Sequence, residues 1–186
     1  MTIHSSHPFP TPPDDVRRFR GRLGGVVSLW TSSGPAGLTV SSLMVSLGPV
    51  GRVLGLLDPD SDLCLALSDS GRAVVQLLSW GDRGLADAFA GTAPAPGGAF
   101  AAASWVETGH GPRLATATVW ALVSLESLAP VGWSSLATCT IDSLEVGEDG
   151  EGEQAPLVHR RGRYQRGGGG GGGGGDGGDG GGGFPG

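Results

Sequence analysis

Residues 26–61 read VVSLWTSSGPAGLTVSSLMVSLGPVGRVLGLLDPDS, and this stretch indicates the fold. Residues 24–31 and 38–47 are rich in the β-branched and aromatic residues that favour strands. Between them, residues 32–37 hold the Ser, Gly and Pro residues that favour a turn. Residues 52–57 form a third apolar run. The stretch therefore predicts three consecutive strands, with neighbouring strands antiparallel.

Two helices and further strands follow in the pattern. The Asp- and Ser-rich residues 58–62 predict a helix start at about residue 61, and Gly71 predicts its end. A second helix is expected over residues 82–90, with Leu85 and Phe89 facing inward. Strands are predicted over residues 73–78, 104–107, 114–128 (with a bend or bulge), 134–146 and 156–158. A mainly β, mostly antiparallel fold with a few helices follows, either a barrel or a sandwich.

Composition divides the 186-residue chain into three predicted parts. Residues 1–15 form a proline-rich lead, residues 16–166 one domain, and residues 167–186 a glycine-rich tail that we expect to be disordered. A net charge of −6 argues against a dedicated nucleic-acid binder. No apolar run is long enough for a membrane helix, and no secretory signal is visible. Cys64 and Cys139 fit buried thiols in a reducing cytoplasm.

Several motifs occur in an order that is typical of one family. They are residues 37–42 (GLTVSS), 45–49 (VSLGP), 85–91 (LADAFAG) and 156–164 (PLVHRRGRY). Over residues 16–166 the chain resembles the flavin reductase-like domain family. The resemblance implies an FMN-binding split β-barrel and an NAD(P)H-dependent flavin reductase, of the kind that supplies two-component monooxygenases. It also implies a homodimer, a bound flavin (FMN or FAD), and NADH or NADPH as co-substrate.

The resemblance also implies which residues contact the flavin. Residues 39–42 would lie along the ring and ribityl chain, and residues 58–62, after the third strand, would face the phosphate. Arginines near that segment would compensate its charge. The predicted cofactor-binding residues are Thr39, Val40, Ser41, Ser42, Ser46, Ser61, Arg72 and Arg163. The alternatives are a Ser/Thr-rich strand that faces water, a plain helix cap at Ser61, and solvated arginines.

Three departures from the family pattern bear on activity. Asp58, Asp60 and Asp62 would repel a phosphate unless they point away from it. Ser134 stands where many reductases have a histidine, and Trp133 beside it is expected to fill core rather than stack on a ring. Gln76 replaces a common strand asparagine.

Several hypotheses about the function therefore stay open. A non-catalytic ligand-binding module on the same fold is the second hypothesis, and a scaffold protein is a weaker third. The sequence indicates no catalytic acid or base and no metal site. His110, in a Gly-rich turn, is expected to be an exposed turn residue rather than part of a ligand mouth.

Overall fold

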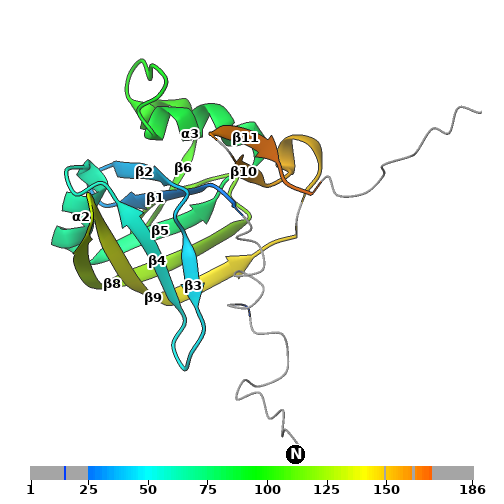
Figure 1. Cartoon of the computed structure of the whole chain (residues 1–186). Coiled ribbons are helices and arrows are strands. Elements are labelled where there is room, and N and C mark those ends of the chain that lie inside the picture. The colour runs from blue at the N-terminus through cyan, green and yellow to red at the C-terminus, as the bar shows by residue number, and fades with distance from the viewer. Residues whose placement is uncertain (1–14, 16–24, 149, 161, 169–186) are drawn as a thin grey trace, which may run out of the picture.

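The computed structural model describes residues 15, 25–148, 150–160 and 162–168. Its body is a seven-stranded sheet in the order β2-β1-β5-β8-β9-β4-β3, in which every pairing is antiparallel (Figure 1). The strands are β1 (Ser28–Ser32), β2 (Ala36–Val40), β3 (Met44–Ser46), β4 (Arg52–Leu57), β5 (Arg72–Leu77), β8 (Val119–Val131) and β9 (Ser134–Val146). The mainly β, mostly antiparallel class is confirmed.

Two hairpins and two α-helices complete the described part. The hairpins are β6–β7 (Trp105–Thr108, Gly111–Leu114) and β10–β11 (Leu157–Arg160, Arg163–Arg166). The helices are α2 (Asp62–Ser70) and α3 (Arg83–Phe89), with short 3-10 turns η1 (Trp80–Asp82), η2 (Ala99–Ala102) and η3 (Gly152–Gln154). In Figure 1, α3 and the β10–β11 hairpin lie beside each other at one end of the sheet. None of the helices in the described residues has the length and apolar character needed to cross a membrane.

The core has two apolar clusters, one inside the curled sheet and one between the sheet and α3. Alternation along β4 explains the first, because Val53 and Leu57 point inward while Leu56 points outward. Trp30 is fully buried in this cluster, and a Cβ on Gly55 would lie 2.9 Å from its indole. The second cluster includes Leu85 and Phe89 of α3, as predicted.

Most predicted elements are confirmed, with shifts at their ends. Ser61 caps α2 and Gly71, with φ +67°, ends it. The prediction of one strand over residues 38–47 is wrong. The chain leaves the sheet edge after β2, and the Ser42 hydroxyl then bonds to both the N–H and the carbonyl of Leu56, at 2.9 and 3.2 Å. Through this contact, the segment between β2 and β3 lies against β4 before β3 begins.

The later strands differ from the prediction in length. The expected strand over residues 114–128 is divided, because β7 ends at Leu114 and β8 begins at Val119. The expected bulge is confirmed as two register shifts against β9. The predicted strand over residues 156–158 is one arm of the β10–β11 hairpin, whose turn contains Gly162 at φ +74°. The predicted lead and the possible helix after it fall outside the described residues, except Asp15, and so does the tail beyond Gly168.

Both cysteines are buried and free, as predicted. Burial raises the pKa of the Cys139 thiol to about 12, and the charges of Glu126 and Asp142 act in the same direction. Trp133, by contrast, is 98% exposed at the tip of the β8–β9 hairpin. The prediction that Trp133 fills core is therefore wrong for this chain.

Gln76 joins three strands from a fully buried position on β5. Its Oε1 accepts a hydrogen bond from the Leu114 N–H at 2.7 Å, and its Nε2 donates to the Thr31 hydroxyl at 3.5 Å. Thr31 in turn donates to the Pro112 carbonyl at 2.5 Å. Gln76 therefore holds β7 against β5 and β1.

Replacing Gln76 by leucine tests this role. The Gln76→Leu variant leaves the buried Leu114 N–H without its acceptor, so we expect it to lower the free energy of unfolding by about 1–3 kcal/mol. Urea unfolding followed by tryptophan fluorescence measures the difference. Gln165→Leu, at an exposed position on β11, is the control and should change stability by less than about 0.5 kcal/mol. Equal stability of the two variants would contradict the role of Gln76.

Candidate functional site

A cavity of about 440 Å³ lies between the end of β2, α3 and the β10–β11 hairpin. Its volume falls within the range of about 300–1,000 Å³ that is usual for small-molecule sites. It brings together residues from three distant parts of the sequence. The residues that line it are Val27, Thr39, Ser41, Asp87, Ala90, Thr92, His159, Gly162 and Tyr164. We call this cavity the hydroxyl pocket.

Close packing of α3 on β2 fixes one wall of the hydroxyl pocket. The Thr39 hydroxyl donates to the Ala86 carbonyl at 2.8 Å. A Cβ on Gly37 would lie 2.6 Å from the Phe89 ring, so only glycine lets the helix approach this closely. Phe89 also packs edge-on against Phe100, with ring centroids 4.8 Å apart. The position of α3 relative to β2 is therefore set by packing as well as by a hydrogen bond.

A polar network around Asp87 connects α3 with the β10–β11 hairpin at this pocket. Thr92 donates its hydroxyl to Asp87 Oδ1 at 3.1 Å, and Asp87 lies near enough to Tyr164 to raise the pKa of that side chain. The Tyr164 ring meets His159 edge-on at 5.7 Å. Burial raises the pKa of Tyr164, and the charge and hydrogen bond of Asp87 add to the increase. The described lining holds one carboxylate and no arginine.

Ser41 is the lining residue best placed to meet a ligand. It is exposed, and its hydroxyl has no hydrogen-bond partner within the part of the chain that the structure describes. Val27 and Ala90 add apolar surface to the same cavity. A pocket with apolar patches and several hydroxyl groups suits a flat ligand with a polar edge.

Three other predicted residues near this block have different surroundings. Val40 is buried in the core, so only its backbone is available to a ligand. The Ser42 hydroxyl is engaged with the backbone of Leu56. Ser46 is exposed on β3, opposite Arg52 of β4, and does not line the hydroxyl pocket.

Ser61 acts as the cap of α2. Its hydroxyl donates to the Asp58 carbonyl at 2.7 Å and accepts from the Cys64 N–H at 3.2 Å. The carboxylate of Asp58 accepts from the Asp60 N–H at 3.0 Å. These bonds fit the helix-cap alternative, since the Ser61 proton already has an acceptor. A role of Ser61 toward a phosphate stays a prediction.

Neither predicted arginine lines the pocket, and Arg72 lies away from Ser61. Arg72 follows Gly71 at the opposite end of α2, and this nine-residue helix is about 13 Å long. Arg163 shares the β10–β11 hairpin with Tyr164, but adjacent residues of a strand point to opposite faces. Its side chain therefore lies on the face away from His159 and Tyr164. The structure does not gather Ser61, Arg72 and Arg163 around one point.

Four polar residues of the hydroxyl pocket were not predicted from the sequence: Asp87, Thr92, His159 and Tyr164. No local pattern links Asp87 with Tyr164, because their contact depends on how α3 and the hairpin pack. The sequence did contain a pattern that could have indicated His159 and Tyr164, the two lining residues on the hairpin strands. In residues 156–164, strand alternation around a glycine turn places His159 and Tyr164 on one face.

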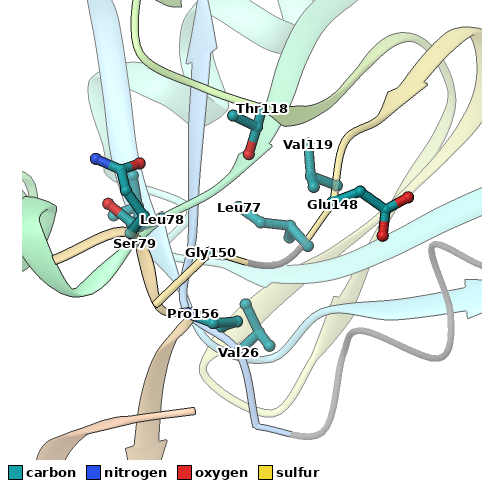
Figure 2. Close-up of a pocket in the computed structure, with 10 residues that line it drawn as sticks. Val26, Leu77, Leu78, Ser79, Thr118, Val119, Glu148, Gly150 and Pro156 are labelled. Atoms are coloured by element: carbon teal, nitrogen blue, oxygen red, sulfur yellow. The ribbon is translucent and has the colours of Figure 1, made fainter. Parts of the chain in front are cut away.

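Other candidates are poorer sites. The pocket in Figure 2, lined by Val26, Leu77, Pro156 and others, has a volume of about 40 Å³, too small for a nucleotide. His110 Nε2 lies 2.9 Å from Asp142 Oδ2, and Ser124 donates to that same oxygen at 2.6 Å. The serine thus bonds to the carboxylate rather than the imidazole, and it lacks an adjacent base. Among the described residues, no three His, Cys, Asp or Glu side chains gather as a metal site would require.

The single tyrosine of the chain allows the Asp87 network to be tested directly. We expect the pKa of Tyr164 to fall in Asp87→Asn, because the neighbouring negative charge is removed, and to stay above the ordinary value, because burial persists. The raised pKa stabilises the fold below the ordinary tyrosine pKa, and this stabilisation is lost as pH rises through the raised value. Ultraviolet absorbance of tyrosinate measures the titration.

A matched variant controls for the change in net charge. Asp69→Asn removes one negative charge at an exposed position on α2. It should leave the tyrosine titration as in the unmodified protein. If Asp87→Asn also leaves it unchanged, the contact between Asp87 and Tyr164 does not exist in solution.

Comparison with known proteins identifies the family of the chain. Residues 20–168 match the family model described as flavin reductase like domain. Proteins named NADH:FMN oxidoreductase from Rhodococcus erythropolis and Rhodococcus qingshengii are 30% identical over 142 residues, covering 76% of this chain and 73% of theirs.

Solved structures share the fold at lower identity. The Streptomyces globisporus C-1027 NADH:FAD oxidoreductase SgcE6 is 21% identical, with a TM-score of 0.65 over 85% of this chain and 96% of its own. SgcE6 has also been solved in complex with NAD and FAD fragments. Nitrilotriacetate monooxygenase component B from Mycobacterium thermoresistibile is 21% identical, with a TM-score of 0.66 over 81% of this chain and 86% of its own. The match over residues 20–168 and the 30% identical relatives show that this chain belongs to the flavin reductase-like domain family.

Proposed function

We propose that the protein is an NAD(P)H:flavin oxidoreductase whose flavin ring binds in the hydroxyl pocket. The observation that carries the proposal is that Thr39 and Ser41, from the family's Thr-x-Ser-Ser block, line a cavity of about 440 Å³. The Rhodococcus relatives and SgcE6 carry NADH in their names, which supports NADH as the hydride donor. Those names include both FMN and FAD, and FMN is our first choice because the 30% identical relatives carry it.

The residues of the pocket fit the chemistry of a flavin ring. One edge of the ring system carries an N–H and carbonyl groups, which hydroxyl groups and backbone can bond. Ser41 supplies a hydroxyl without a partner in the described chain, and Val27 and Ala90 supply apolar contact. When bound, the flavin itself accepts the hydride, while the protein holds and orients it. Hydride transfer requires no acid or base from the chain, and we assign none.

The phosphate contacts stay a prediction on residues 58–62, with Arg72 and Arg163 as possible partners. Asp58, Asp60 and Asp62 are unfavourable for a dianion near that segment. Ser134, in place of the family histidine, pairs with Val131 at the tip of the β8–β9 hairpin. It lies outside the hydroxyl pocket of its own chain. These features favour the second candidate, a flavin-holding module that does not turn over.

A flavin titration separates the two candidates. We expect purified protein to quench the fluorescence of added FMN with a saturable curve, and NADH to bleach the bound flavin band anaerobically. Ser41→Ala should weaken FMN binding by about 2- to 10-fold, the usual effect of one hydrogen bond. Ser46→Ala, outside the pocket, should change it less.

The outcomes have distinct meanings. Binding without bleaching would leave only the non-catalytic module. An absence of FMN binding would overturn both candidates. A larger loss of FMN affinity in Ser46→Ala than in Ser41→Ala would indicate that the ring binds at the β3 edge instead. NADPH, tested in the same cuvette, gives the nucleotide preference.

We further propose a homodimer that forms through an apolar stripe on the outer face of β3, β4, β8 and β9. Exposed or half-buried residues of the stripe are Met44, Leu56, Leu136 and Val131, with Trp133 beside them at the hairpin tip. The strand register supports one surface, because Leu56 pairs with Leu136 across β4 and β9. Contiguous exposed apolar residues on a sheet face are typical of interaction sites.

Arginine on this stripe should prevent association. We expect Leu56→Arg to sediment as a monomer of 18.6 kDa and the unmodified protein at twice that mass. Leu65→Arg is the control, since Leu65 is equally apolar and 58% exposed, but lies on α2. Analytical ultracentrifugation measures both. A monomeric unmodified protein, or a dimer that survives Leu56→Arg and dissociates in Leu65→Arg, would contradict the proposed interface.

The remaining assignments follow from this function. We propose that residues 16–166 form the catalytic domain and that the protein works in the cytoplasm, where the free thiols of Cys64 and Cys139 stay reduced. The nitrilotriacetate relative is named as a component of a monooxygenase, which supports a separate flavin-dependent oxygenase as the consumer of reduced flavin.

A further inference from the structure

Asp87 contributes a negative charge to the wall of the hydroxyl pocket. It is the one carboxylate among the described lining residues, and no arginine lines the pocket with it. The Thr92 hydroxyl donates to it and the Tyr164 hydroxyl lies near it, and both groups are neutral. Neither of these two groups compensates the charge of the carboxylate.

Among the residues that the structure describes, the arginines on the hairpin and at the start of α3 either lie on the other face of the hairpin or pair with Glu153. Arg160 and Arg163 oppose each other on the β10–β11 hairpin, on the face away from Tyr164. Arg83 and Arg166 are engaged with Glu153, at 3.0 and 3.3 Å. His159 is the one nitrogen base in the described lining. Among the described lining residues, the carboxylate of Asp87 is therefore the one acidic group that a ligand in this pocket meets.

The proposed reaction changes the charge of the ligand in that field. A hydride, with its two electrons, leaves C4 of NADH and bonds to the flavin ring, so that NADH is oxidised to NAD⁺ and the flavin is reduced. The oxidised ring is neutral. The reduced ring takes up the hydride without a proton and carries one negative charge. The balance is NADH + FMN → NAD⁺ + FMNH⁻.

We propose that Asp87 weakens the binding of reduced flavin relative to oxidised flavin and thereby favours release of the reduced product. Two like charges at close range in a partly buried site repel each other, whereas the neutral oxidised ring is not repelled. Release matters for a reductase that delivers reduced flavin to a second protein. This inference rests on the proposed function, because it needs the flavin ring in the hydroxyl pocket.

The test compares two redox states of one ligand. The full-length protein and Asp87→Asn are titrated anaerobically at pH 8 with oxidised FMN and with dithionite-reduced FMN, following tryptophan fluorescence. We expect the ratio of the reduced to the oxidised Kd to exceed one in the unmodified protein. Asp87→Asn should lower that ratio by about 5- to 20-fold, mainly through the reduced form. Asparagine keeps one acceptor oxygen for the hydroxyl groups of the network.

Two controls isolate the charge of Asp87. Asp69→Asn removes the same charge on α2 and should leave the ratio unchanged. Riboflavin, which lacks the phosphate, should give the same ratio as FMN, because the added charge is on the ring. Repulsion of the phosphate by residues 58–62 would weaken both redox states of FMN alike.

The result that overturns the inference does not require a variant. A ratio of one or less in the unmodified protein excludes it, even if Asp87→Asn fails to fold. An equal change of both Kd values in Asp87→Asn also excludes it, since the residue would then only shape the pocket. If the unmodified protein does not bind oxidised FMN, the proposed function fails as well, and this outcome is distinct from a failed ratio.

Discussion

The packing of Trp30 against Gly55 is the contact on which the rest of the structure depends. Trp30 lies in β1, whose five residues are all buried and which pairs with both β2 and β5. Its indole reaches across the interior to β4, where only a glycine leaves room for it. This contact holds the two ends of the sheet toward each other, and so it sets the position of β2, which carries Thr39 and leads into Ser41.

Polar side chains near the site divide into structural and available groups. Ser28, Thr31 and Gln76 are fully buried, and each has hydrogen-bond partners within the chain. Ser42 and Ser61 are similarly engaged with backbone groups. Ser41 is exposed to the pocket without such a partner. Within the Ser/Thr-rich block, the Ser42 hydroxyl thus joins β4, while the hydroxyl of its neighbour Ser41 has no hydrogen-bond partner among the described residues.

Charge distinguishes this pocket from a phosphate site. Asp87 lies in the wall, whereas Arg160 and Arg163 lie on the other face of the C-terminal hairpin and Arg166 pairs with Glu153. A neutral ring system suits such a pocket better than an anion does. Binding and release of a flavin would then depend on its redox state, which changes the charge of the ring.

The sequence by itself determined the elements and the family. Strand-rich runs, glycine turns and the α2 cap depend on neighbouring residues, so α2, α3, β4, β5 and β9 could be predicted within a few residues. The motifs around Thr39 and Ser41 likewise gave one wall of the pocket. Local patterns did not show that β2 and β3 are separate, because the break depends on Ser42 bonding to a strand formed later in the chain. Local patterns also predicted that Trp133 packs in the core, although within the described chain its side chain is exposed.

Only the tertiary structure decided which side chains share the site. Asp87, His159 and Tyr164 meet because α3 packs on β2 and the hairpin folds over it, and no spacing in the sequence records that contact. It also separated Arg72 from Ser61 by the length of α2, and strand alternation placed Arg163 on the hairpin face away from Tyr164. Residue types indicate which chemistry is possible, but the direction of each side chain depends on packing between distant elements.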